Sequence, residues 1–133
     1  MSSFFIDITE VQPSQLYISK SKLEKINEWF DPKDLSLFEP IPVKKLNGNI
    51  IFVDGHTRAC AAYKAGLKEL LVYFEDEDLD WEAYERCVDE CKKQGINNIS
   101  NLCNRIVGDE EYQKLWYGWC DRLHKELEEK RKK

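Results

Sequence analysis

The stretch of residues 50–66 constrains this chain more than any other part of the sequence. Four apolar residues run directly into the polar turn 54–58, which reads Asp-Gly-His-Thr-Arg. An alanine-rich segment follows the turn and stops at Gly66. A short apolar run before a turn predicts a buried strand, and a glycine after a helical segment is a common helix stop. We therefore expect a strand, a sharp turn and a helix over about residues 57–65.

The turn itself contains the residue types of an anion site. Gly55 allows a tight turn and the close approach of a ligand to the backbone. His56 and Thr57 fall at the helix start, where unpaired N–H groups and the helix dipole favour anions such as phosphate. Arg58 adds a planar guanidinium that grips phosphate in two places. The turn therefore predicts a phosphate site.

Asp54 has two interpretations. Beside a phosphate site, a carboxylate either holds a metal ion that bridges phosphates or accepts a proton from an attacking hydroxyl. Alternatively, Asp54 is only the N-cap of the helix, with His56 and Arg58 solvated in its first turn. The combination of these residues after an apolar strand favours a ligand site.

The first part of the chain alternates predicted strands and helices. Ser21 with Glu24 fits a capping box that would start a helix ending at Asp31-Pro32. Asn47-Gly48 predicts a hairpin turn between an edge strand over 42–46 and a strand over 49–53. Further strands are predicted over residues 4–8 and 70–74, with a loop over 10–18 between the first strand and the first helix. These elements predict an α+β unit over residues 1–75, with a small mixed sheet and helices.

An acidic segment at 75–78 marks the predicted domain boundary, and the rest of the chain is expected to be a helical appendage over residues 76–133. Asp80 is the predicted cap of a helix that runs to about Lys93. Ser100 is the predicted cap of a short helix that carries Ile106 and Val107. Asp109 is the predicted cap of a long helix to the C-terminus, with an apolar face from Tyr112 to Leu127. We expect these helices to pack onto the small first unit.

Composition excludes several classes of protein. The formal net charge is -5, which argues against nucleic-acid binding. No apolar run is long enough to span a membrane, and no leader sequence is recognisable. The five cysteines follow neither a metal nor a disulfide template, so we expect a reducing, cytoplasmic setting and no metal site. Cys87 and Cys91 lie one helical turn apart, but no second ligand pair completes a site, so core positions are favoured for both and for Cys60.

The sequence resembles the ParB/sulfiredoxin superfamily over about residues 4–75. The resemblance rests on the strand and turn 53–58 with the following helix and Gly66, on residues 11–15 (Val-Gln-Pro-Ser-Gln), and on residues 40–43 (Pro-Ile-Pro-Val) before the hairpin. It implies the small mixed sheet of that superfamily and binding of a nucleotide (ATP, ADP or CTP) with Mg²⁺. Sulfiredoxin itself is disfavoured, because its nucleophilic cysteine would fall at His56, and Cys60 lies further inside the helix.

The turn is most similar to that of the free serine kinases. By this resemblance Asp54 and His56 would be catalytic, and Gly55, His56, Thr57 and Arg58 would hold phosphate. Gln15 and Tyr17 would lie in the loop that faces the turn. Those kinases use a glutamate where Gln15 falls, and an amide cannot act as a base.

Three interpretations of function remain open at this stage. The first is a Mg²⁺-dependent small-molecule kinase or nucleotide hydrolase. The second is a non-catalytic ParB-like module that binds a nucleotide or a small phosphorylated ligand, with the helical appendage mediating a homodimer or a protein contact. The third is a DNA-associated ParB-like protein, which the acidic charge and the lack of a recognition helix disfavour.

Overall fold

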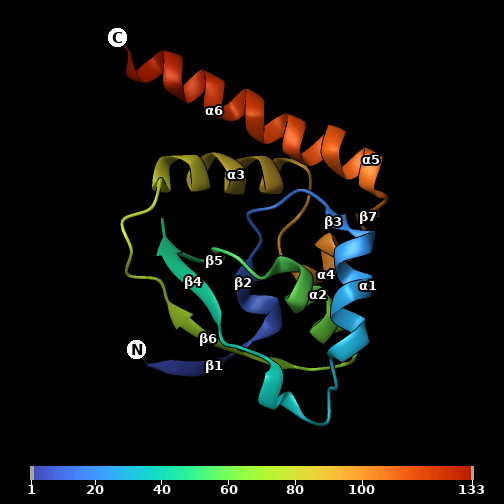
Figure 1. Ribbon diagram of the computed structural model, residues 1–133. Helices are drawn as coiled ribbons and strands as arrows, with labels where there is room; N and C mark the ends of the chain where they lie inside the picture. Colours follow the sequence, from blue (N-terminus) through green and yellow to red (C-terminus); the bar gives the residue numbers. More distant parts are fainter. Residues whose placement is uncertain (1, 133) are drawn as a thin grey trace.

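The computed structural model describes residues 2–132, in which a mixed sheet packs against helices (Figure 1). The sheet order is β1-β6-β4-β5-β2, formed by Ser3–Asp7, Glu69–Phe74, Ile41–Leu46, Asn49–Phe52 and Val11–Gln12. The pairs β1/β6 and β4/β5 are antiparallel, whereas β6/β4 and β5/β2 are parallel. The predicted α+β fold class is confirmed.

The β4–β5 hairpin turns at Asn47-Gly48 as predicted. Both residues adopt left-handed backbone angles, with φ of 51° and 83°, which asparagine and glycine tolerate best. The prediction that residues 42–46 form an edge strand is wrong, because β4 lies between β5 and β6.

Pro42 is tolerated inside the sheet because β5 ends beside it. The carbonyl of Pro42 accepts a hydrogen bond from the Val53 N–H at 3.0 Å. Proline has no N–H to donate in return. The Val53 carbonyl accepts from the Tyr84 hydroxyl instead, at 3.1 Å. The strand that leads into the polar turn is therefore tied at its end to a helix from the second half of the chain.

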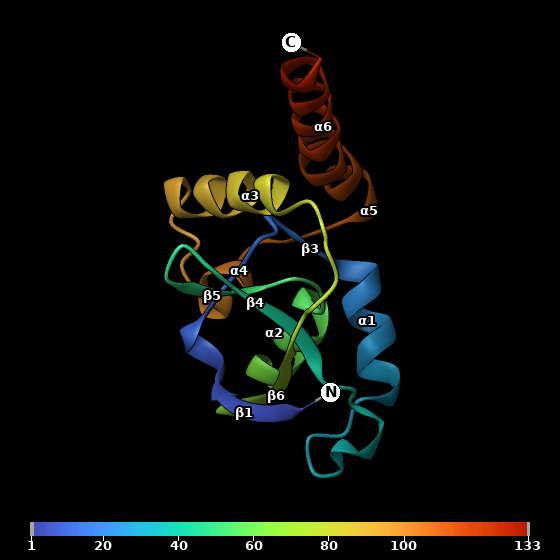
Figure 2. The same cartoon turned by 90° about the vertical axis from the view of Figure 1, so that its left-hand side faces the viewer.

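Helix α1 (Lys20–Trp29) and helix α2 (His56–Lys64) pack against each other, and α2 lies between the sheet and α1 (Figures 1 and 2). The predicted cap of α1 is wrong: the side chain of Ser19, not Ser21, accepts from the Lys22 N–H. Ser21 instead donates its hydroxyl proton to Asp109 Oδ1 at 2.6 Å. The predicted start of α2 and its stop at Gly66 are confirmed within one residue.

Three short elements extend into the segment predicted as a loop over residues 10–18. A 3₁₀ turn, Ile8–Glu10, precedes β2, and β3 (Ile18–Ser19) pairs in parallel with β7 (Ile106–Val107). The prediction that Ile106 and Val107 lie in a helix is wrong, because the pairing with β3 holds them in an extended conformation. A second 3₁₀ turn spans Leu35–Leu37.

The second half of the chain is mainly helical. Helix α3 (Trp81–Lys93) is capped by Asp80 as predicted, whereas α4 (Ile99–Leu102) is capped by Asn98 rather than by Ser100. The predicted long C-terminal helix is confirmed as α5 (Asp109–Tyr112), a π-helical turn (Gln113–Tyr117) and α6 (Gly118–Arg131). Its predicted cap is wrong, because Gly108 is the N-cap and Asp109 is the first helical residue. Helix α6 crosses over α3, and its C-terminal end extends beyond the rest of the protein (Figures 1 and 2).

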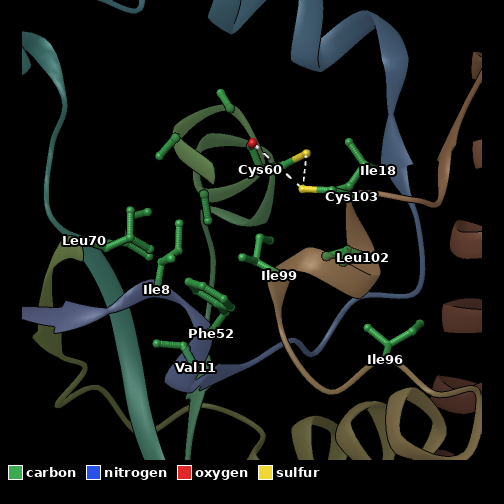
Figure 3. Close-up of a cluster of buried hydrophobic side chains, with 14 of the residues drawn as sticks. Ile8, Val11, Ile18, Phe52, Cys60, Leu70, Ile96, Ile99, Leu102 and Cys103 are labelled. Atoms are coloured by element: carbon green, nitrogen blue, oxygen red, sulfur yellow. Dashed lines mark hydrogen bonds between the residues drawn. The ribbon is translucent and has the colours of Figure 1, made fainter. Parts of the chain in front are cut away.

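The main core combines side chains from both halves of the chain (Figure 3). Phe52 from β5, Cys60 from α2 and Leu102 from α4 are fully buried in the same cluster. The division into residues 1–75 and 76–133 remains a prediction. Between residues 2 and 132, no helix combines the length and the apolar character needed to cross a membrane.

Candidate functional site

The polar turn connects the end of β5 to the N-terminus of α2. Gly55 is the N-cap, with a φ of 78°, and no side chain caps the helix. A Cβ atom on Gly55 would lie 2.9 Å from Arg58 Nη2 and 3.1 Å from Ile41. The interpretation of Asp54 as the N-cap is therefore wrong. The first N–H groups of α2 have no cap and are available to a ligand.

His56 is buried as a neutral ring. Its Nε2 accepts a hydrogen bond from the Ser14 backbone N–H at 2.9 Å, while the Ser14 hydroxyl donates to the Phe52 carbonyl at 2.6 Å. Because a backbone N–H only donates, Nε2 is unprotonated and the proton of the neutral ring is on Nδ1. Burial lowers the pKa of His56 to about 4, against the opposing effect of the Asp54 charge. At neutral pH the ring therefore offers one N–H donor.

A cavity of about 330 Å³, which we call the basic cavity, opens at this turn. Its wall combines residues 54–58 with side chains of α1, of the loop after β2 and of α5. The lining residues are Gln15, Lys22, Lys25, Ile26, Asp54, Gly55, His56, Thr57, Arg58 and Tyr112. The structure thus brings all five predicted turn residues and Gln15 to one cavity, within the size range of small-ligand sites.

Three cations of the basic cavity have no carboxylate partner among residues 2–132: Lys22, Lys25 and Arg58. The Lys22 ammonium donates to the Tyr117 hydroxyl at 2.7 Å and lies 5.2 Å from the ring centre of Tyr112. Arg58 Nη1 donates to the Glu39 carbonyl at 3.0 Å. Each of these neutral partners leaves the positive charge uncompensated, so the cavity favours an anion.

Sequence reasoning missed Lys22 and Lys25. Their signal was a spacing of three residues in a predicted helix, which places two side chains on one face. Only the pairing of α1 with α2 shows that this face meets the turn.

Gln15 and Tyr17, the two loop residues implied by the family resemblance, differ in position. Gln15 Nε2 donates to the Tyr17 carbonyl at 2.7 Å and to the Tyr112 hydroxyl at 3.1 Å. Its amide oxygen therefore remains as an acceptor. The ring of Tyr17 instead packs on Arg105, whose guanidinium carbon is 4.3 Å from the ring centre. The structure brings Gln15, but not the Tyr17 ring, to the turn.

A second cavity of about 230 Å³ lies between the turn, α3 and α6, and we call it the helical cavity. Its lining residues are Ser14, Gln15, Val53, Asp54, His56, Asp80, Ala83, Tyr84, Cys87, Trp116, Cys120, Leu123 and His124. The basic and helical cavities share Gln15, Asp54 and His56. The Asp54 carboxylate therefore borders both.

The cysteines considered above as possible metal ligands or nucleophiles lie in environments that do not suit those roles. Burial raises the pKa of Cys87 and of Cys91 to about 12, so both thiols are neutral at physiological pH. Cys60 is fully buried in the core, as predicted, and its sulfur lies 2.8 Å from that of Cys103 (Figure 3). No group of three potential metal-ligating side chains occurs within residues 2–132.

Comparison of the sequence with known proteins gives a relative from an archaeon. No family model matches the sequence. A protein of Methanocaldococcus jannaschii, described as uncharacterized protein MJ0188, is 33% identical over 101 residues, which are 74% of this chain and 33% of that protein. The chain therefore spans about a third of the length of this curated relative.

Two solved structures are similar in fold. Protein Atu1540 from Agrobacterium tumefaciens matches with a TM-score of 0.52 and 18% identity, over 77% of this chain and 61% of that one. The C-terminally truncated chromosome-partitioning protein ParB from Caulobacter crescentus, complexed with CTP-gamma-S, matches with a TM-score of 0.48 and 22% identity, over 70% and 54% of the two chains. The first match shows that the α+β arrangement recurs in Atu1540.

Proposed function

We propose that the basic cavity binds the phosphate groups of a nucleotide. The observation that carries this proposal is the convergence of Lys22, Lys25 and Arg58, all without a carboxylate partner in the described chain, on the uncapped N-terminus of α2. A helix N-terminus offers backbone donors and a partial positive charge to phosphate. The resemblance of the turn to the nucleotide-binding turn of the ParB/sulfiredoxin superfamily supports the same ligand.

Each part of the cavity has a distinct role in this proposal. The N–H groups at the start of α2 and the Thr57 hydroxyl would donate to one phosphate. Arg58, in the first turn of α2, and the two lysines of α1 would neutralise the remaining charge. The Nδ1 proton of His56 would supply a neutral donor, because its ring does not ionise at physiological pH.

Thermal shift and calorimetric titration with ATP, ADP, CTP and inorganic phosphate test the binding. We expect saturable nucleotide binding that weakens at least about tenfold in Arg58→Ala and in the double variant Lys22→Ala/Lys25→Ala, since charge-assisted hydrogen bonds contribute about 1.5–3 kcal/mol each. Lys45→Ala removes an exposed lysine of β4 outside the basic cavity and is the matched control. Equal affinities for the cavity and control variants would refute the proposal.

A second candidate function, phosphoryl transfer or nucleotide hydrolysis, is favoured by the position of Asp54. This carboxylate borders both cavities and forms no ion pair with the described residues. It is free to accept a proton from an attacking hydroxyl. It also fits as the protein carboxylate of a Mg²⁺ ion, which usually takes its other ligands from phosphates and water.

Turnover separates the catalytic candidate from a binding module. In the catalytic case Asp54→Asn retains nucleotide affinity and loses product formation, measured by chromatography of the nucleotide products with Mg²⁺ present. In the binding-module case the unmodified protein binds nucleotide without forming product. The second outcome agrees with the amide of Gln15 at the position where the similar kinases carry a glutamate.

A further inference from the structure

The helical cavity has a largely apolar wall that phosphate binding does not use. Helix α3 contributes Tyr84 and Cys87, and the C-terminal helical region contributes Trp116, Cys120 and Leu123. Burial raises the pKa of Cys120 to about 11, so its thiol, like that of Cys87, is neutral at pH 7. The Tyr84 hydroxyl already donates its proton to the Val53 carbonyl. These side chains therefore present rings, methyl groups and neutral thiols to a ligand.

The charges around the helical cavity are opposite to those of the basic cavity. Its lining, as the described residues give it, contains two carboxylates and neither lysine nor arginine. The Arg131 guanidinium donates hydrogen bonds to both carboxylate oxygens of Asp80, at 2.8 Å to Oδ1 and 3.0 Å to Oδ2. Asp54 forms no ion pair with the described chain. One carboxylate without an ion-pair partner, the solvent-exposed Asp54, therefore lies at the edge of a largely apolar cavity.

We propose that the helical cavity binds a small arylalkylamine, a molecule with an aromatic ring and an alkylammonium group. Its ammonium group lies against Asp54, and its ring packs against the apolar wall formed by Tyr84, Trp116 and Leu123. An aromatic ring suits walls that contain other rings, because offset and edge-to-face contacts are favourable. A cation over the faces of Tyr or Trp gains a further attraction. An anion is disfavoured in this cavity because neither lysine nor arginine lines it and the anion would approach Asp54.

This site does not depend on phosphate binding, although the two ligands would meet at Asp54. In these proposals the basic cavity binds an anion on one side of the Asp54 carboxylate, and the helical cavity binds a cation on the other side. The arrangement therefore sorts two ligands by charge at the shared boundary of Gln15, Asp54 and His56.

Titration with tyramine tests the proposal, with 3-(4-hydroxyphenyl)propionate as the matched probe in which a carboxylate replaces the ammonium. Binding is followed by NMR of the tryptophan indole N–H groups, assigned with Trp116→Phe. We expect saturable binding of tyramine with a shift of the Trp116 signal, and affinity for the propionate at least about tenfold lower. Equal binding of the two probes, or no binding of tyramine at millimolar concentration, would overturn the proposal.

Variants locate the site and separate it from phosphate binding. Cys120→Phe fills the helical cavity and should abolish tyramine binding while nucleotide affinity is retained. If that variant does not fold, Cys120→Leu makes a smaller change and should weaken tyramine binding.

Asp54→Asn should lower the affinity for tyramine about tenfold, whereas Asp89→Asn, on the exposed side of α3, should not. Arg58→Ala should lose nucleotide and keep tyramine, so each proposal can fail alone. Unchanged tyramine affinity in a folded Cys120 variant would contradict this location.

Discussion

The buried His56 ring makes the free energy of unfolding depend on pH in a defined window. Its pKa is about 4 in the folded protein, against 6.5 for the unperturbed group. Between these values the unfolded chain binds more protons than the folded one, so acidification favours unfolding. The stabilisation from the neutral ring is fully present above about pH 6.5 and is lost as the pH falls through about 4. One pKa unit corresponds to about 1.4 kcal/mol, so His56 contributes a loss of about 3 kcal/mol over this window.

The variant His56→Gln isolates this contribution. A glutamine carbonyl can still accept the hydrogen bond from the Ser14 N–H, but it does not titrate. Urea unfolding of both proteins at intervals from pH 7.5 to 4 measures the effect, in a range chosen to bracket the two pKa values. Carboxylates titrate in both proteins and cancel in the difference. We expect the unmodified protein to lose about 3 kcal/mol more than the variant across the window.

The chain contains two histidines, so NMR of the imidazole C–H signals gives an independent readout. The signal that disappears in His56→Gln should not shift until the pH approaches 4. Parallel stability curves for the two proteins would refute this reasoning, and so would a His56 signal that titrates near its unperturbed pKa.

Three further predictions concern the packing around the site, each measured as a free energy of unfolding in urea. Gly55→Ala should cost at least about 1 kcal/mol more than Gly48→Ala: both positions have positive φ, but only at Gly55 would the added Cβ meet Arg58 and Ile41. Equal costs would show that the neighbours move away freely. Tyr84→Phe should cost about 1 kcal/mol, because the Val53 carbonyl opposite Pro42 loses its donor, whereas Tyr63→Phe, at an exposed hydroxyl, should be nearly neutral. A fragment of residues 1–75 should show no cooperative transition, because it lacks the buried Ile96, Ile99 and Leu102 of the shared core; a cooperative transition would mean that the first unit folds independently.

The parts of the fold that were predicted correctly depend on local chemistry. Asn47-Gly48 and Gly66 accept left-handed backbone angles, and Asp80 caps the helix that immediately follows it. The errors in strand assignment arose where distant segments determine the structure. Ile106 and Val107 are extended because β3 pairs with them, and β4 is central because β6 adds to its other side. Single-sequence periodicity contains no information on either pairing.

The same distinction applies to the candidate site. Residues 54–58 are contiguous in sequence, so the chemistry of one turn pointed to an anion site there. Lys22, Lys25 and Tyr112 reach the basic cavity only through the packing of α1 and α5 against the turn. The protonation of His56 was also inaccessible to sequence reasoning, because it follows from the Ser14 N–H that the fold places beside the ring.

The bonds that hold the loop after β2 have a consequence for synthesis on the ribosome. Gln15 is held by the Tyr112 hydroxyl, 97 positions later, and the Leu16 carbonyl by Arg105, 89 positions later. Contacts of such long separation form late, because the intervening chain must be ordered first. Nascent chains grow at about 5–20 residues per second. The strand and turn at residues 50–58 therefore leave the ribosome seconds before the partners of the facing loop exist. A chain that stalls before Tyr112 carries the whole polar turn but lacks a completed cavity, so we expect the proposed nucleotide to bind only after synthesis has passed that residue.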